Sequence, residues 1–172
     1  MTPEPAPLYE PQRPPLPTGL RRVATRLPVH MFRAGLGPLF RGRLLLLVHT
    51  GRTTGRPRRT VIEVVESATV DGRRSWTVAS GFGPDADWYR NLVRTPHAAV
   101  QDGRRFHAVT AHLLPAEEGG EVMSRYASRH PRTARRLAGF MGLAVDGRTV
   151  DYHRVGESLP FVRLVEGTGP RR

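Results

Sequence analysis

The sequence predicts a mainly β domain with flanking helices, an α+β class in which six strands form a small antiparallel barrel. Short runs of leucine, β-branched and aromatic residues recur along the 172-residue chain and are separated by turn residues. The dipeptide Asp-Gly follows two of these runs, and it is typical of two-residue hairpin turns. Apolar residues at helical spacing occupy several of the stretches between the runs. The length is that of one domain.

The strands are predicted by composition and by their turns. Five consecutive apolar residues predict a buried first strand that ends at His49. Asp71-Gly72 joins the second strand to the third as a type I′ turn, and Asp102-Gly103 is expected to join the fourth to the fifth in the same way. The six predicted strands are residues 44–48, 60–70, 75–80, 98–101, 106–114 and 161–165.

Four helices are predicted from the apolar spacing. The first begins at Thr18, is rich in arginine, and is broken or kinked by Pro28. Asp85 or Asp87 is expected to cap the second helix, and Pro131 separates the last two. Residues 143–158 receive no assignment. The helices cover residues 18–31, 85–94, 116–128 and 132–141; a proline-rich arm (1–17) precedes the single domain (18–166), and a short tail (167–172) follows it.

Composition narrows the chemistry. The 27 basic residues are all arginine, so the net charge is +12, and neither lysine nor cysteine is present. This excludes Schiff-base chemistry, thiolate nucleophiles and thiolate metal sites. Residues 11–62 hold 11 arginines and no acid, which indicates an anionic partner: nucleic acid, a membrane surface or a polyanionic small molecule. The absence of a signal peptide or membrane span predicts a cytoplasmic protein.

Three motifs are candidates for a binding site. Residues 51–59 form a loop in which two glycines let backbone N–H groups approach an anion, while hydroxyls and guanidinium groups surround it. Residues 78–83 end a strand with small residues, which leaves room for a flat ring. Residues 87–92 predict a helix with Trp88, Asn91 and Leu92 on one face. Asn91 there either ties down the glycine loop or touches a ligand.

Other reaction classes lack their residues. The seven histidines show no metal-ligand spacing, and no Gly-x-Ser-x-Gly elbow occurs, so we expect neither a metal site nor a side-chain nucleophile. Hydride transfer remains, because there the cofactor carries the chemistry and the protein supplies binding and orientation.

The three motifs together, with residues 159–164 at the end of the domain, resemble the deazaflavin-dependent nitroreductase family. This actinobacterial family has a six-stranded split β-barrel like that of FMN-binding proteins and uses coenzyme F-420, which carries a ring, a phosphate and an oligoglutamate tail. The resemblance extends over about residues 20–165. It implies an oxidoreductase that passes a hydride from reduced F-420 to a conjugated acceptor such as a quinone, an enone or a nitro compound.

The resemblance also implies roles for single residues. Thr53 stands where many members have a basic residue, and Arg56 or Arg59 is expected to compensate. Ser80 is the nearest candidate for a proton donor. Tyr126 and His130 fall in the segment that contributes the substrate pocket, although this chain lacks the tyrosines of nitroimidazole-reducing members. The implied cofactor-binding residues are Arg52, Thr53, Thr54, Arg56, Arg58 and Arg59 for the phosphate and tail, Val78, Ala79, Ser80 and Gly81 for the ring, and Trp88, Tyr89 and Asn91 as the helix that closes the pocket.

Several alternatives stay open at this point. An FMN-dependent split-barrel oxidoreductase is the alternative within enzymes. A nucleic-acid-binding module fits the charge, but the aromatic residues do not interleave with the arginines, so we expect no nucleic-acid partner. The basic first helix predicts either packing on its own domain or a peripheral contact with the inner face of the membrane. The protein is expected to be a monomer or a homodimer.

Overall fold

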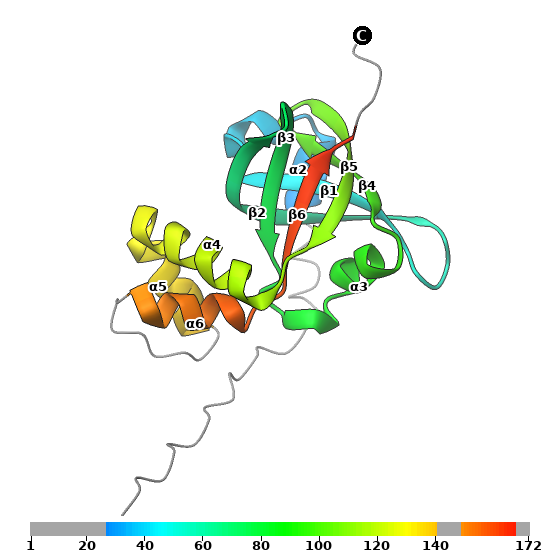
Figure 1. Ribbon diagram of the computed structural model, residues 1–172. Coiled ribbons are helices and arrows are strands. Elements are labelled where there is room, and N and C mark those ends of the chain that lie inside the picture. The colour runs from blue at the N-terminus through cyan, green and yellow to red at the C-terminus, as the bar shows by residue number, and fades with distance from the viewer. Residues whose placement is uncertain (1–26, 141–148, 168–172) are drawn as a thin grey trace, which may run out of the picture.

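The computed structural model describes residues 27–140 and 149–167, which form a closed barrel of six antiparallel strands with helices around it (Figure 1). The strand order around the barrel is β1-β2-β3-β6-β5-β4. This confirms the predicted fold class. The strands are β1 (Leu44–Thr50), β2 (Pro57–Val70), β3 (Arg73–Ala79), β4 (His97–Asp102), β5 (Arg105–Leu113) and β6 (Phe161–Glu166).

The barrel interior is the main hydrophobic core. Leu45 and Leu47 point into it and are fully buried, and Trp76 is 2% exposed. Leu46, on the outer face of the same strand, is also buried. A strand that is covered on both faces has no polar alternation, which explains the uninterrupted leucines. The remaining core members are Ile62, Val78, Leu92, Val100, Val109, Ala111, Val162 and Leu164.

The two hairpin turns differ. Asp71 and Gly72 both have positive φ, at 51° and 73°, as a type I′ turn requires, so this prediction is confirmed. The second turn was predicted incorrectly. Asp102 pairs with Arg105 inside the ladder, so the two-residue loop is Gly103-Arg104, with positive φ at the glycine alone. A glycine at the first turn position is the type II′ pattern.

The first strand is longer than predicted, and this changes where its last residues lie. β1 continues through His49 to Thr50 and pairs with β2, which already begins at Pro57. The connecting loop is therefore only residues 51–56. A register shift between Val64 and Glu66 bends β2, so its first half pairs with β1 and its second half with β3.

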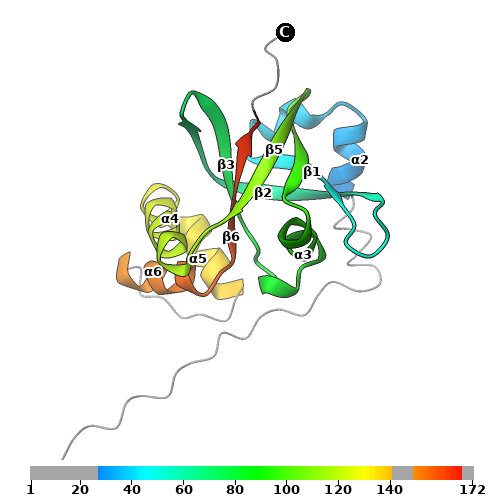
Figure 2. The same cartoon turned by 45° about the vertical axis from the view of Figure 1, so that its right-hand side comes forward.

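A short helix closes one mouth of the barrel (Figure 2). η2 (Gly83–Asp85) leads into α3 (Asp87–Arg94), whose Leu92 is buried in the barrel core. The predicted cap is wrong: Ala86 is the N-cap residue and makes no side-chain cap. The carboxylates of Asp85 and Asp87 instead pair with Arg90 at 3.6 Å and Arg52 at 2.9 Å.

Three further helices form a second layer beside the barrel: α4 (Ala116–Arg129), α5 (Pro131–Phe140) and α6 (Thr149–Glu157) (Figure 1). α6 lies in the stretch without a predicted assignment. Gly156 lowers its helix propensity, yet this glycine is needed because α4 and α6 cross closely there. A Cβ at Gly156 would lie 2.7 Å from the Cα of Gly120. Tyr126, Tyr152 and Phe161 belong to the core of this layer.

The outer face of the barrel carries α2 (Leu27–Arg33) and η1 (Gly37–Phe40). Phe32 is 2% exposed and its ring stacks on Phe40 at 5.2 Å, so α2 packs on its own domain. Pro28 is the second residue of α2, a helix position that tolerates proline. The predicted proline-rich arm, the first part of the basic helix and most of the tail lie outside the described residues. Among the helices described, none is long and apolar enough to cross a membrane.

Candidate functional site

The β1–β2 loop, residues 51–56, is a tight turn with exposed backbone donors. Gly51 N–H donates to the Arg56 carbonyl at 2.9 Å, and Gly55 N–H donates to the Gly51 carbonyl at 2.8 Å. Gly55 has a φ of +65°, which favours glycine. The N–H groups of Thr53 and Thr54 have no acceptor in the described part of the chain, and both residues are exposed. The loop therefore presents free donors to an anion.

Asn91 ties this loop to α3. Its Oδ1 accepts the backbone N–H of Arg52 at 3.0 Å and the Arg52 guanidinium at 3.1 Å. Its Nδ2 lies 3.0 Å from Nδ1 of His49. The side chain is 3% exposed. Of the two roles left open for Asn91, the structure shows the anchoring of the glycine loop.

The four arginines around the loop are not equivalent. Arg52 is drawn to α3, where Asp87 and Asn91 hold its guanidinium. Arg58 is opposite His49 in the β1–β2 register. The Arg58 Cγ lies 3.4 Å from the position that a Cβ on Gly51 would occupy. Arg59 pairs with Val48 and so lies on the opposite face of β2. Within residues 27–140 and 149–167, no carboxylate pairs with Arg56, Arg58 or Arg59.

His49 is a buried histidine beneath the loop, and sequence reasoning gave it no role. Burial and the nearby Arg58 guanidinium lower its pKa to about 4, while Asp87 acts in the opposite direction. The imidazole is therefore neutral at physiological pH. In the sequence, His49 is recognisable only as a polar residue at the end of an apolar strand. Its pairing with Asn91 could not be predicted, because Asn91 belongs to a helix that is distant in the sequence.

The segment at the end of β3 has most of its polar groups occupied. Val78 is fully buried and pairs with strands on both sides. Ser80 is 1% exposed, and its hydroxyl donates to the Gly83 carbonyl at 2.6 Å, which closes the turn and commits its proton there. Gly81 is different, because a Cβ on it would meet open space. Open space in this segment therefore lies at Gly81, while Ala79 packs toward the helices behind it.

The aromatic residues of α3 face the barrel. Trp88 and Tyr89 are half-buried, pack against the barrel core, and meet edge to face with centroids 6.0 Å apart. They border the same helix that anchors the loop through Asn91.

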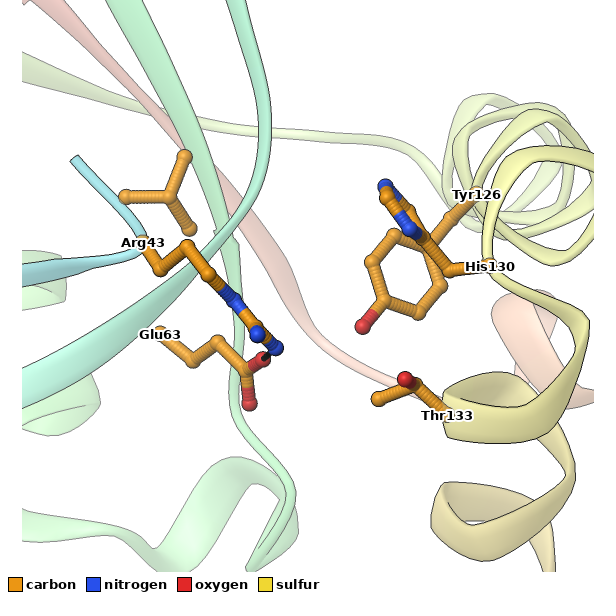
Figure 3. A pocket seen from close by; sticks show the side chains of 6 residues that line it. Arg43, Glu63, Tyr126, His130 and Thr133 are labelled. Atoms are coloured by element: carbon orange, nitrogen blue, oxygen red, sulfur yellow. Dashed lines mark hydrogen bonds and ion pairs between the residues drawn. The ribbon is translucent and has the colours of Figure 1, made fainter. Parts of the chain in front are cut away.

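A pocket of about 180 Å³ lies between the barrel and the helical layer (Figure 3). Tyr126 and His130, both predicted for a substrate pocket, line it together, with rings 5.1 Å apart. Arg43 and Glu63 face them from the barrel and form an ion pair at 3.4 Å. The remaining lining residues are Val64 and Thr133.

The pocket offers hydrogen-bond donors from both walls. Burial raises the pKa of Tyr126, so its hydroxyl stays protonated and able to donate. The guanidinium of Arg43 is the donor on the opposite wall. Sequence reasoning missed Arg43 and Glu63, because only the β1–β2 register places them together: the next residue, Leu44, is paired with Glu63.

The glycine loop and the pocket lie at opposite ends of β1, about 20 Å apart along the strand. The end of β3 lies beside the pocket, since the pocket residue Val64 is the cross-strand partner of Val78. No group of side chains suited to a metal ion occurs among residues 27–140 and 149–167.

These features define a β-barrel protein with an arginine-rich glycine loop at one end of β1 and a polar pocket at the other. The chain belongs to the F-420H(2)-dependent quinone reductase family, whose sequence profile matches residues 22–140. It is therefore an oxidoreductase, and its cofactor is coenzyme F-420.

Several solved structures resemble the chain. An F-420-H2 dependent reductase (FDR-A) is 21% identical, with a TM-score of 0.47 over 71% of this chain and 93% of that chain. A conserved hypothetical protein from Mycobacterium tuberculosis is 17% identical, with a TM-score of 0.46 over 77% and 79%. An FMN-binding protein from Nostoc punctiforme, related to pyridoxamine 5′-phosphate oxidase, is 12% identical, with a TM-score of 0.44 over 80% and 76%. No curated protein matches the chain.

Proposed function

We propose that this F-420-dependent oxidoreductase reduces a quinone, that the glycine loop binds the phosphate and tail of the cofactor, and that the acceptor enters the pocket at Tyr126 and His130. The observation that carries the proposal is a glycine loop beside two cations, Arg56 and Arg58, that pair with no described carboxylate, with a polar pocket about 20 Å away along β1.

The donor set of the loop fits a polyanionic cofactor. Arg56 and Arg58 supply guanidinium groups that no described carboxylate neutralises, and Thr53 and Thr54 supply free N–H groups. Guanidinium groups bind phosphate and carboxylate through paired hydrogen bonds. Arg52 contributes by shaping the loop, because its own guanidinium is held by Asp87 and Asn91. Arg59 would compensate for Thr53 only from the opposite face of β2.

The ring end fits the surface around Gly81, where a Cβ would meet no atom of the described residues within 4 Å. Trp88 and Tyr89 would border it from α3. When bound in reduced form, the cofactor supplies the hydride. The protein binds and orients both partners, and the Tyr126 hydroxyl or the His130 imidazole gives the proton in place of Ser80, whose hydroxyl is committed to Gly83.

A quinone suits the pocket because its two carbonyl oxygens accept hydrogen bonds at opposite ends. Tyr126 and Arg43 donate from opposite walls. The volume of about 180 Å³ is below the range of about 300–1,000 Å³ typical of drug-sized ligands, so one small ring system fits.

The test is a steady-state comparison of a soluble naphthoquinone, a cyclic enone and a nitroimidazole as acceptors for reduced F-420. We expect the quinone to give the highest kcat/KM, and Tyr126→Phe to lower that value for the quinone. A matched control is Tyr152→Phe, a buried tyrosine of α6 that does not line the pocket. Equal rates for Tyr126→Phe and the unaltered protein would contradict the assignment of the pocket.

A further inference from the structure

His49 joins the glycine loop to α3, although it does not belong to the loop. It is the next-to-last residue of β1, its side chain is 5% exposed, and its Nδ1 lies 3.0 Å from Nδ2 of Asn91. Asn91 in turn binds the backbone N–H of Arg52, the first residue after Gly51. A continuous chain of hydrogen bonds therefore runs from the barrel through the helix to the loop.

The donors in this chain fix the state of His49. Arg52 brings only N–H groups to Asn91, one from the backbone at 3.0 Å and one from the guanidinium at 3.1 Å. They orient the amide with its oxygen toward Arg52 and its Nδ2 toward His49. Since Nδ2 can only donate, Nδ1 of His49 has to accept. The imidazole is consequently neutral, with its proton on Nε2.

The charges around the imidazole agree with this assignment. Arg58 faces it from β2, Arg52 lies in the loop above it, and Asp87 faces it from α3. Burial and Arg58 disfavour the charged form more than Asp87 favours it, which holds the pKa near 4. The hydrogen bond to Asn91 is thus available throughout the neutral pH range.

We propose that His49 is a positioning residue: acting through Asn91, its Nδ1 holds the glycine loop in the conformation that binds the anionic part of the cofactor. This rests on the proposed role of the loop. Without the acceptor, Nδ2 of Asn91 is left unsatisfied in a buried site, and the amide is free to turn away from Arg52. The loop then has to be ordered at the time of binding, which lowers affinity.

Two substitutions at one position test this. His49→Asn places a non-titrating oxygen near the position of Nδ1, whereas His49→Leu fills the site without an acceptor. At neutral pH we expect His49→Leu to weaken F-420 binding about fivefold to fiftyfold, and His49→Asn to restore most of it. At saturating F-420, kcat should stay unchanged in both, because neither variant alters the acceptor pocket.

Two further measurements separate this role from a general effect on folding. Hydrogen exchange of the Arg52 amide should speed up in His49→Leu and not in His49→Asn, while the melting temperature of the two variants is compared as the control. In a double-mutant cycle, Asn91→Ala combined with His49→Leu should bind F-420 no more weakly than Asn91→Ala alone.

Each outcome decides between the two proposals. Unchanged exchange at Arg52 and unchanged affinity in His49→Leu would overturn the positioning role. Additive losses in the cycle would overturn it as well, since His49 would then act without Asn91. Faster exchange at Arg52 with unchanged F-420 affinity would instead show that the loop is held by His49 but does not bind the cofactor, and the proposed function of the loop would fail.

Discussion

Arg58 and Arg59 are neighbours in the sequence, but they lie on opposite faces of β2. Arg58 lies on the face of His49 and packs beside Gly51, while Arg59 lies across from Val48. We predict that Arg58→Ala weakens F-420 binding by about 1.5–3 kcal/mol, the range for a hydrogen bond to a charged group. Fluorescence titration of the protein with F-420 measures the change.

Arg59→Ala is the matched control. It removes the same charge from the neighbouring residue, whose side chain lies on the opposite face of β2 from Arg58. Its effect on the F-420 dissociation constant should stay below about 0.5 kcal/mol. Equal losses in the two variants would mean that the loop acts through its overall charge and not through the placement of Arg58.

At the residue scale, the sequence predicted what depends on local spacing. Asn91 was placed on the buried face of its helix by counting from Trp88, and its anchoring role was one of two expected. Its partner His49 was not predicted, because 42 residues separate the two and only the barrel brings them together. Arg58 and Arg59 were grouped because the point where the loop becomes a strand was predicted three residues too late.

The crossing of α4 and α6 depends on glycine. A Cβ at Gly156 would lie 2.6 Å from the Cβ of Met123 and would also meet the backbone of Gly119 and Gly120. Gly156→Ala should therefore lower the free energy of unfolding by about 1–3 kcal/mol, the usual cost of overpacking. Chemical denaturation followed by circular dichroism measures it.

Gly139→Ala in α5 is the control, and we expect it to change the free energy of unfolding in the opposite direction. A Cβ there meets nothing within 4 Å in the described part of the chain, so the substitution should raise stability by about 0.5–1 kcal/mol through the unfolded state. A gain of stability in both variants would show that helix propensity, and not the close crossing, sets the result.

Glu66 fastens the helical layer to the barrel. Its two oxygens accept Nε and Nη2 of Arg125, both at 3.1 Å, and Arg129 lies 3.7 Å away. The hydrogen bond from Arg125 lowers the pKa of Glu66. The folded state therefore keeps this carboxylate charged to lower pH than the unfolded chain does. Its contribution to stability is present above the ordinary pKa and is lost as pH falls through the lowered one.

Glu66→Gln should consequently destabilise the protein at neutral pH and have a smaller effect at acidic pH, below the ordinary pKa of a glutamate. Denaturation at the two pH values, with Glu63→Gln as a control carboxylate in a more exposed ion pair, measures the difference. An equal loss at both pH values would contradict the assigned role of the charge.

At the element scale, prediction succeeded where a local signal exists. All six strands and the type I′ turn at Asp71-Gly72 follow from composition and turn chemistry. α6 was not predicted, because its tertiary packing requires the glycine that weakens its helical pattern. Only one wall of the pocket was predicted. Tyr126 and His130 lie in one helical segment of the sequence, whereas Arg43 and Glu63 come together only through the strand register.

For the whole molecule, the excess of positive charge has a defined place. Several arginines elsewhere on the described part of the chain have acidic partners, such as Arg74 with Asp102 at 2.8 Å and Arg163 with Glu118. The arginines at positions 56, 58 and 59 have none among the described residues. Part of the charge that the sequence concentrates in residues 11–62 is thus left without a described acidic partner beside the glycine loop, where Arg56 and Arg58 would meet a polyanionic cofactor.

The most direct test of this account is a titration of the purified protein with F-420 and, separately, with FMN, followed by mixing the protein and reduced F-420 with a naphthoquinone. We expect saturable binding of F-420, weaker binding of FMN, and quinone-dependent return of the visible absorbance of oxidised F-420. Binding of FMN without binding of F-420, or no oxidation of reduced F-420 by the quinone, would contradict it.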